Sequence, residues 1–148
     1  MIRRRFRHVS IRLLLLALAG AAAFVAGCAP ANPEAVEAAT AAVEDWLALV
    51  DQGKYEESWQ EAAQAFRNHV TAEEWTRQIQ PIRDPLGDLQ SREVSGASYA
   101  TSLPGAPDGE YVIIRFKTAF ANKGTAVETV TPMLDADGTW RVSGYFIK

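Results

Sequence analysis

Apolar residues recur at the spacing of an α-helix from Pro33 towards Gly53. The residues of this apolar stripe are Val36, Ala39, Val43, Trp46, Leu47 and Val50. Asn32 can cap the first turn, Pro33 suits the first helical position, and Gly53 is a natural stop after the last turn. The pattern therefore predicts a helix that buries one face.

A second helical pattern covers residues 55–70, and a third begins at Thr71. The apolar face of the second helix consists of Tyr55, Trp59, Ala62, Phe66 and Val70. Thr71 and Glu74 have the spacing of a capping box, in which two side chains satisfy free backbone N–H groups. The inward positions of the third helix are Trp75 and Ile79. Pro81 is expected to end this helix, because the residue before a proline is biased away from helical dihedral angles.

From residue 88 onward the pattern changes to the period of two that is typical of strands. A weak strand rich in Ser and Ala covers residues 89–103, and we expect a bulge or bend at Gly96. The strongest strand pattern covers residues 110–121. Its shared face consists of Val112, Ile114, Phe116, Thr118 and Phe120. The remaining strands are expected at 126–134 and 139–147. On the last strand, the alternation places Tyr145 on the face opposite Trp140.

Three helices followed by four strands joined in sequence predict an α+β fold. In this fold the N-terminal helices pack on a four-stranded antiparallel meander sheet. Residues 34–148 are long enough to form one domain with one hydrophobic core, and we expect a single domain there.

The segment 1–27 has the pattern of a secretory signal peptide, with basic residues before an apolar run of 14 residues. Gly27 and Cys28 complete a small-small-Cys site that resembles the lipobox of bacterial lipoproteins. The resemblance implies that signal peptidase II cleaves between Gly27 and Cys28. It also implies that the Cys28 thiol receives a diacylglyceryl group and the new amine an acyl chain such as palmitate. The alternative is an ordinary signal peptide or a transmembrane anchor, although the run is short for a bilayer span.

Residues 28–33 would then form a lipidated tether. The part after Cys28 reaches at most roughly 17 Å, so the domain is expected close to the membrane surface. Ala29, and not Asp, follows the lipidated position. By resemblance to Gram-negative sorting, this favours the outer membrane, facing the periplasm. In another type of host, the expected location is the outer face of the cytoplasmic membrane.

The charge of the chain limits its partners. Without residues 1–27 the chain has ten basic and 18 acidic residues, so its formal net charge changes from −3 to −8. Such a balance argues against nucleic acid, whose binding rests on neutralised phosphates, and against a polybasic contact with anionic lipid. The membrane contact should come from the lipid on Cys28. With one cysteine, no intramolecular disulfide can form.

Several blocks of the sequence resemble a bacterial family called domain of unknown function 4019 (DUF4019). They are residues 46–59, Val70-Thr71 with Trp75, Arg83 with 85–87, Arg92, 107–112, 128–130 and 137–145. Together and in this order, they cover most of the chain after residue 35. The resemblance implies a cone similar to nuclear transport factor 2 and the cystatin-like group, with a curved sheet around helices. Relatives of this cone include isomerases, dehydratases and non-catalytic binding modules, so the fold does not choose a function.

Residues that could carry catalysis are scarce. His69 is the only histidine after residue 27, and its place at the end of a helix favours a helix-terminal role. No nucleophile and base pair of the usual kind is available, so no catalytic residue is assigned. The segment 135–138 has a fragment of calcium-loop spacing but lacks the other ligands, and we interpret it as a hairpin turn. No metal or cofactor is therefore expected.

Four residues form the candidate pocket or interaction site: Arg83, Arg92, Glu128 and Tyr145. Glu128 lies in a strand pattern on the same face as Val130, where a carboxylate must be paired, hydrogen-bonded or exposed. Its candidate partners are Arg92, Arg115 and Lys117. Glu128 is either a cross-strand ion pair or a general base with Tyr145 or Arg92. Arg83 and Arg92 either clamp an anionic ligand or tie the corner after the third helix to helix carbonyls.

Three functions remain open. The first is a membrane-anchored, non-catalytic adaptor or accessory domain that binds another envelope protein. The second is a binding module for a small apolar or amphipathic ligand inside the cone. The third is a small enzyme that uses Glu128 as acid or base. A cavity that reaches Glu128 would favour the second or third, and an exposed apolar patch would favour the first.

Overall fold

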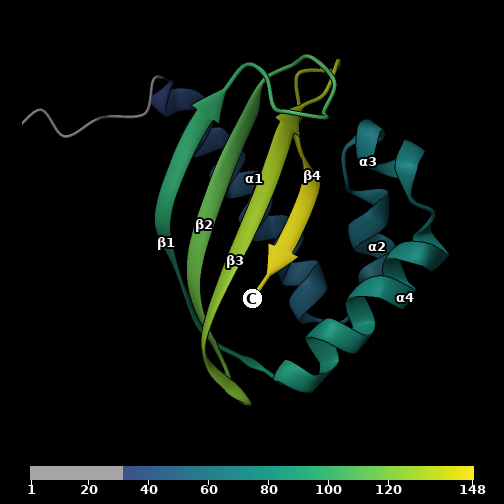
Figure 1. Cartoon of the computed structure of the whole chain (residues 1–148), viewed down its shortest axis with the longest axis vertical. Coiled ribbons are helices and arrows are strands. Elements are labelled where there is room, and N and C mark those ends of the chain that lie inside the picture. The colour runs from purple at the N-terminus through teal and green to yellow at the C-terminus, as the bar shows by residue number, and fades with distance from the viewer. Residues whose placement is uncertain (1–31) are drawn as a thin grey trace, which may run out of the picture.

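The computed structural model describes residues 32–148, which fold as helices followed by a four-stranded antiparallel sheet (Figure 1). The helices are α1 (Pro33–Asp51), α2 (Tyr55–Gln60), α3 (Gln64–His69), α4 (Ala72–Arg83) and the 3₁₀ helix η1 (Asp84–Leu86). The strands are β1 (Leu89–Ala100), β2 (Tyr111–Phe120), β3 (Lys123–Leu134) and β4 (Trp140–Ile147). The α+β prediction is confirmed. The predicted signal peptide and most of the tether lie outside the described residues.

Helix α1 follows the sequence pattern. Asn32 caps it, because its Oδ1 accepts a hydrogen bond from the N–H of Ala35 at 3.1 Å. Its buried residues are Ala35, Ala39, Val43, Trp46, Leu47 and Val50. The helix ends at Asp51, two residues before Gly53, whose φ of 71° suits a residue without a side chain. No helix within residues 32–148 is both long and apolar enough to cross a membrane.

The prediction of one helix over residues 55–70 is wrong, since the structure has two short helices there, α2 and α3. The chain leaves the helical path at Ala62 and Ala63, which are both fully buried. The N–H of Ala63 donates to the carbonyl of Val142 on β4 at 2.8 Å. A contact with a strand far along the chain therefore replaces a helical hydrogen bond, which helical periodicity alone cannot show.

Helix α4 begins as predicted and ends later than predicted. The capping box of Thr71 and Glu74 is present, and Trp75 and Ile79 are buried. Pro81, however, lies inside the helix, which continues to Arg83. A proline in the last turn removes few hydrogen bonds, and the N–H of the residue after Arg83 still donates to the carbonyl of Gln80. Because Arg83 is itself buried, tertiary contacts hold this last turn.

The strand order in the sheet is β1-β2-β3-β4. Helix α1 covers one face, which we call the inner face, and α2, α3 and α4 lie beyond β4 (Figure 1). The predicted inner positions of β2 are buried, which confirms the alternation there. The predicted irregularity at Gly96 is also present, as a register shift between Val94 and Gly96. The opposite face of the sheet, which we call the open face, carries exposed polar residues of β2 such as Arg115 and Lys117.

The prediction for β4 is wrong in one respect. The alternation placed Tyr145 opposite Trp140, but both side chains pack against the same hydrophobic core. The cause is a register shift opposite Thr131 and Pro132, where β4 has one residue more than β3. The extra residue reverses the alternation after Val142. Tyr145 therefore points to the inner face, and Phe146 points to the open face.

Candidate functional site

The structure places the four candidate residues in one largely buried group of side chains on the inner face. We call it the Arg92 network, and its members are Asp51, Arg83, Arg92, Thr118, Glu128 and Tyr145. They come from α1, α4, β1, β2, β3 and β4, so every long element of the domain contributes one side chain. The network therefore connects the helices to each strand of the sheet.

Glu128 is the centre of the network and is fully buried. Its Oε2 accepts hydrogen bonds from Nε of Arg92 at 2.7 Å and from Oγ1 of Thr118 at 2.6 Å. Its Oε1 accepts from the hydroxyl of Tyr145 at 2.7 Å and from Arg92 at 3.2 Å. An ionised carboxylate has about four lone-pair positions. All of them are used within the protein, which leaves none for a substrate proton.

Arg92 joins Glu128 to Asp51. Its two terminal nitrogens donate to the two oxygens of Asp51 at 2.7 and 2.9 Å, in a bidentate pair. Burial lowers the pKa of Arg92, but the hydrogen bonds to Asp51 and Glu128 outweigh it and raise the pKa above its ordinary value. Arg92 therefore stays charged and pairs with two carboxylates at once.

Arg83 also binds Asp51, through one nitrogen at 2.9 Å. Its guanidinium lies over the ring of Phe120, 4.3 Å from the ring centroid, in a cation–π contact. Neither predicted role is what the structure shows: Arg83 holds the corner after α4 through a carboxylate of α1, and no helix carbonyl within residues 32–148 accepts from it. Arg92 is therefore occupied with protein carboxylates on all three of its nitrogens. Arg83 uses one nitrogen for Asp51, and its buried Nε has no hydrogen-bond partner among the described residues.

Tyr145 closes the network on the side of β4. Burial raises the pKa of its hydroxyl, and the charge of Glu128 and the hydrogen bond to it raise the pKa further. The hydroxyl therefore stays protonated and donates. Its ring packs between Trp46 and Trp75, with centroid distances of 5.6 and 6.4 Å. These contacts fix the side chain in a dense aromatic cluster.

Two members of the network, Asp51 and Thr118, are not among the site residues that the sequence predicts. The sequence pattern indicates for Asp51 only a place at the end of a helix, although Asp51 lies four residues after Leu47 and so continues the buried stripe of α1. A carboxylate on a buried stripe indicates a buried cation nearby. Thr118 was placed correctly on the inner face, but nothing in its pattern indicated that it binds Glu128.

The other candidate residues have structural contacts. His69 Nδ1 lies 2.7 Å from the carbonyl of Ala65, in an exposed helix-end contact. Asp135 and Asp137 both form ion pairs with Arg141, at 3.1 and 2.9 Å, which confirms the hairpin turn.

Among residues 32–148, no group of three or more His, Cys, Asp or Glu side chains is arranged to hold a metal ion. Arg115 and Lys117, the other candidate partners of Glu128, lie on the open face.

Among residues 32–148, large apolar side chains are exposed on β1, at Leu89 and Val94, and at the end of α4 and of β4. Ile82 is 49% exposed and Phe146 is 61% exposed. Between α4 and β4 is a pocket of about 150 Å³, which we call the α4–β4 groove. It is lined by Trp75, Gln78, Ile79, Ile82, Tyr145, Phe146 and Ile147. The groove is mainly apolar, and the Glu128 carboxylate is not part of its lining.

One comparison with known proteins gives a match. A family model described as "Protein of unknown function (DUF4019)" matches residues 42–145. No curated protein and no solved structure matches the chain.

Proposed function

Because the chain belongs to the DUF4019 family, whose function is unknown, we propose its role from the geometry of its residues. The protein is a membrane-anchored, non-catalytic adaptor of the bacterial envelope, and it binds another envelope protein through the α4–β4 groove. Its fold is a cone of the kind found in nuclear transport factor 2. The curved sheet with α1 across its inner face supports this assignment (Figure 1).

The observation that carries the proposal is the complete hydrogen bonding of Glu128. A general base needs a lone pair that reaches the substrate, and the four hydrogen bonds from Arg92, Thr118 and Tyr145 occupy those positions. Phe116, which lies in register with Glu128 on the neighbouring strand, belongs to the buried hydrophobic core. A structural role for Glu128 explains these contacts, and an enzymatic role does not.

The groove supports the binding role. Apolar side chains left in water at the edge of a sheet are typical of a surface that a partner covers. Ile82 and Phe146 stand on two sides of the groove and are the two most exposed large apolar residues among those described. The aromatic cluster beneath, with Trp75 and Tyr145, makes the groove floor rigid. A rigid apolar floor favours a protein partner of defined shape.

The lipid anchor rests on the sequence pattern around Cys28. A lipidated chain is held at a membrane surface, where its partners are other envelope proteins. The acidic balance of the chain supports attachment through lipid, since it offers little attraction to anionic headgroups.

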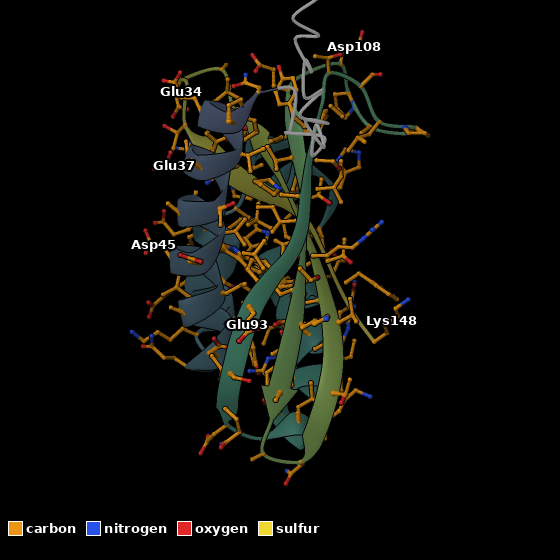
Figure 2. All side chains as sticks on the ribbon, turned by 90° about the vertical axis from the view of Figure 1, so that its left-hand side faces the viewer. Glu34, Glu37, Asp45, Glu93, Asp108 and Lys148 are labelled. Atoms are coloured by element: carbon orange, nitrogen blue, oxygen red, sulfur yellow. The ribbon has the colours of Figure 1, made fainter. Side chains whose placement is uncertain are left out.

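A photo-crosslinking residue tests the proposed surface in the full-length protein in its own membrane. Gln78 lines the groove and is exposed, so we expect a crosslinked complex when the probe replaces it. Glu37 is the matched control, because it is also exposed but lies on α1 and does not line the groove (Figure 2). Equal crosslinking at both positions, or none at Gln78, would contradict the proposed surface.

A further inference from the structure

The outer edge of β4 has free backbone groups next to the groove. Val127 and Lys148 exchange two hydrogen bonds, at 2.9 and 3.1 Å. In an antiparallel pair such bonded residues alternate, so the N–H and C=O groups of Phe146 face β3 and those of Tyr145 and Ile147 face away. Within residues 32–148, no hydrogen bond reaches the outward groups of Tyr145 or Ile147. The edge is open over this stretch.

The two edges of the sheet differ in how they are protected. Strand β1 has two register shifts and carries Arg92 and Glu93 in its middle, features that discourage pairing with another strand. Among the bonds within residues 32–148, the one that closes the outer edge of β4 is at Val142, where Ala63 donates to its carbonyl. After the register shift at Ser143, β4 continues in regular pairing with β3 to its end. The end of β4 is therefore an edge that can accept a further strand, and it is the one that lies beside the α4–β4 groove.

The side chains beside this edge define what the added strand must carry. On the inner side, Ile147 and the exposed Ile82 of α4 offer an apolar surface in the groove. On the open side, Phe146 is exposed. Successive side chains of a strand point to opposite faces, so an added strand would place apolar residues against both surfaces.

Charge gives a second requirement. Phe146 lies in register with Thr129 and Arg115, and Lys148 lies opposite Val127, which is in register with Lys117. None of the three cations forms an ion pair with another described residue. Lys148 extends from the sheet on the side away from α1 (Figure 2). An acidic side chain of the added strand would be attracted to this part of the open face.

We propose that the partner adds an extended segment to the outer edge of β4, as a fifth strand beside the α4–β4 groove. The segment belongs to another protein, and it has apolar residues on both faces and an acidic residue towards Lys148. Backbone hydrogen bonds to Tyr145 and Ile147 give affinity, and the groove and the cations give specificity. This inference rests on the adaptor function proposed above and names how the partner binds.

Amide hydrogen exchange of the purified full-length protein, followed by NMR, tests the open edge without any partner. We expect the amides of Tyr145 and Ile147 to exchange at least about tenfold faster than those of Gly144 and Phe146, which face β3. Equal protection of the four amides would show that the edge is already closed, and would overturn the inference.

The Gln78 crosslink tests the mode of binding in the membrane. Ile147→Pro removes the outward N–H and leaves the pairing with β3 intact, so we expect an about tenfold lower yield. Ile147→Val keeps the N–H and should keep the yield.

If Ile147→Pro crosslinks as well as the wild type, the partner binds in the groove but not as a strand, and only this inference fails. A crosslink to a second copy of the chain would overturn the choice of partner, and no crosslink would remove the adaptor function as well. If Ile147→Pro does not fold, the amide exchange rates of the wild-type protein still test whether the edge of β4 is open.

Discussion

Arg92 lies between the carboxylates of Asp51 and Glu128, and the inner side of the sheet depends on this contact. Arg83 adds a second positive charge, so the network contains two cations and two anions. Buried charges in such a group stabilise the fold only while every partner is present. Removing one member leaves another charge buried and unpaired, which is costly.

Glu128→Gln should therefore destabilise the protein strongly. The amide keeps the size of the side chain but loses the charge that Arg92 needs, and we expect a loss of about 3 kcal/mol in the free energy of unfolding. Urea denaturation followed by circular dichroism measures it. Glu93→Gln, on an exposed residue of β1, should change the value by less than about 0.5 kcal/mol. A Glu128→Gln protein as stable as the wild type would contradict the structural role.

The stability that the turn before β4 gives to the fold should depend on pH. Hydrogen bonds from Arg141 and from the N–H of Thr139 lower the pKa of Asp137 from 3.8 to about 2. The ionised form is favoured in the folded state, so its stabilising effect is complete above pH 4 and disappears as the pH falls towards 2. We expect Asp137→Asn to melt below the wild type at pH 6 and together with it at pH 2. A difference in melting temperature that does not change with pH would disprove this contact.

At the scale of elements, the corner between α4 and β1 positions Arg92 relative to the helices. Gly87 ends this corner with φ 74° and ψ −162°, a conformation that is almost restricted to glycine. A Cβ atom there would lie 3.0 Å from Nδ2 of Asn122 and 3.2 Å from Cβ of Ala121, on the turn between β2 and β3. The corner therefore needs glycine both for its backbone angles and for its close approach to that turn.

Gly87→Ala should cost about 3 kcal/mol, from backbone strain and from the close contacts together. Gly53→Ala is the matched control, because Gly53 also has a positive φ of 71° but a Cβ there would have no atom within 4 Å. We expect it to cost about 1 kcal/mol. Thermal melting of both variants measures the difference, and equal losses would show that the contacts with Ala121 and Asn122 do not matter.

Elements with strong local signals could be predicted from the sequence, and those set by distant contacts could not. Helix α1 and strand β2 follow their apolar periodicity. The capping box of Thr71 depends only on a residue three positions further along the chain. The break after α2 depends on a hydrogen bond from Ala63 to β4, and the reversal in β4 depends on one additional residue in its pairing. The sequence pattern also predicts Arg92 as one of the candidate partners of Glu128. The link of Arg92 to α1 needed the tertiary structure.

At the scale of the whole molecule, charge is unevenly distributed. The outer side of α1 carries Glu34, Glu37 and Asp45, and Lys148 lies across the sheet from them (Figure 2). The exposed cations Arg115 and Lys117 lie on the same open face as Lys148. This polarity gives the proposed partner a preferred side, because an acidic segment is repelled from α1 and attracted to the end of β4.

The proposed anchor predicts how the full chain behaves in cells. Cys28→Ala removes the thiol that would carry the lipid, so the protein should leave the membrane fraction and lose the mass of the lipid. Ala31→Ser, outside the lipobox, should change neither. Fractionation and mass spectrometry of the intact protein make the comparison. A Cys28→Ala protein that stays in the membrane fraction would contradict lipid attachment.

The most direct test of the adaptor function is chemical crosslinking of the full-length protein in living cells, with the crosslinked proteins quantified by mass spectrometry. We expect one envelope protein at near-stoichiometric yield, and its loss in Ile82→Asp, which puts a charge in the α4–β4 groove. Val94→Asp should keep it, because Val94 is similarly exposed, at 47%, but lies on β1. Recovery of the protein alone, or a complex that Ile82→Asp does not weaken, would contradict the adaptor function.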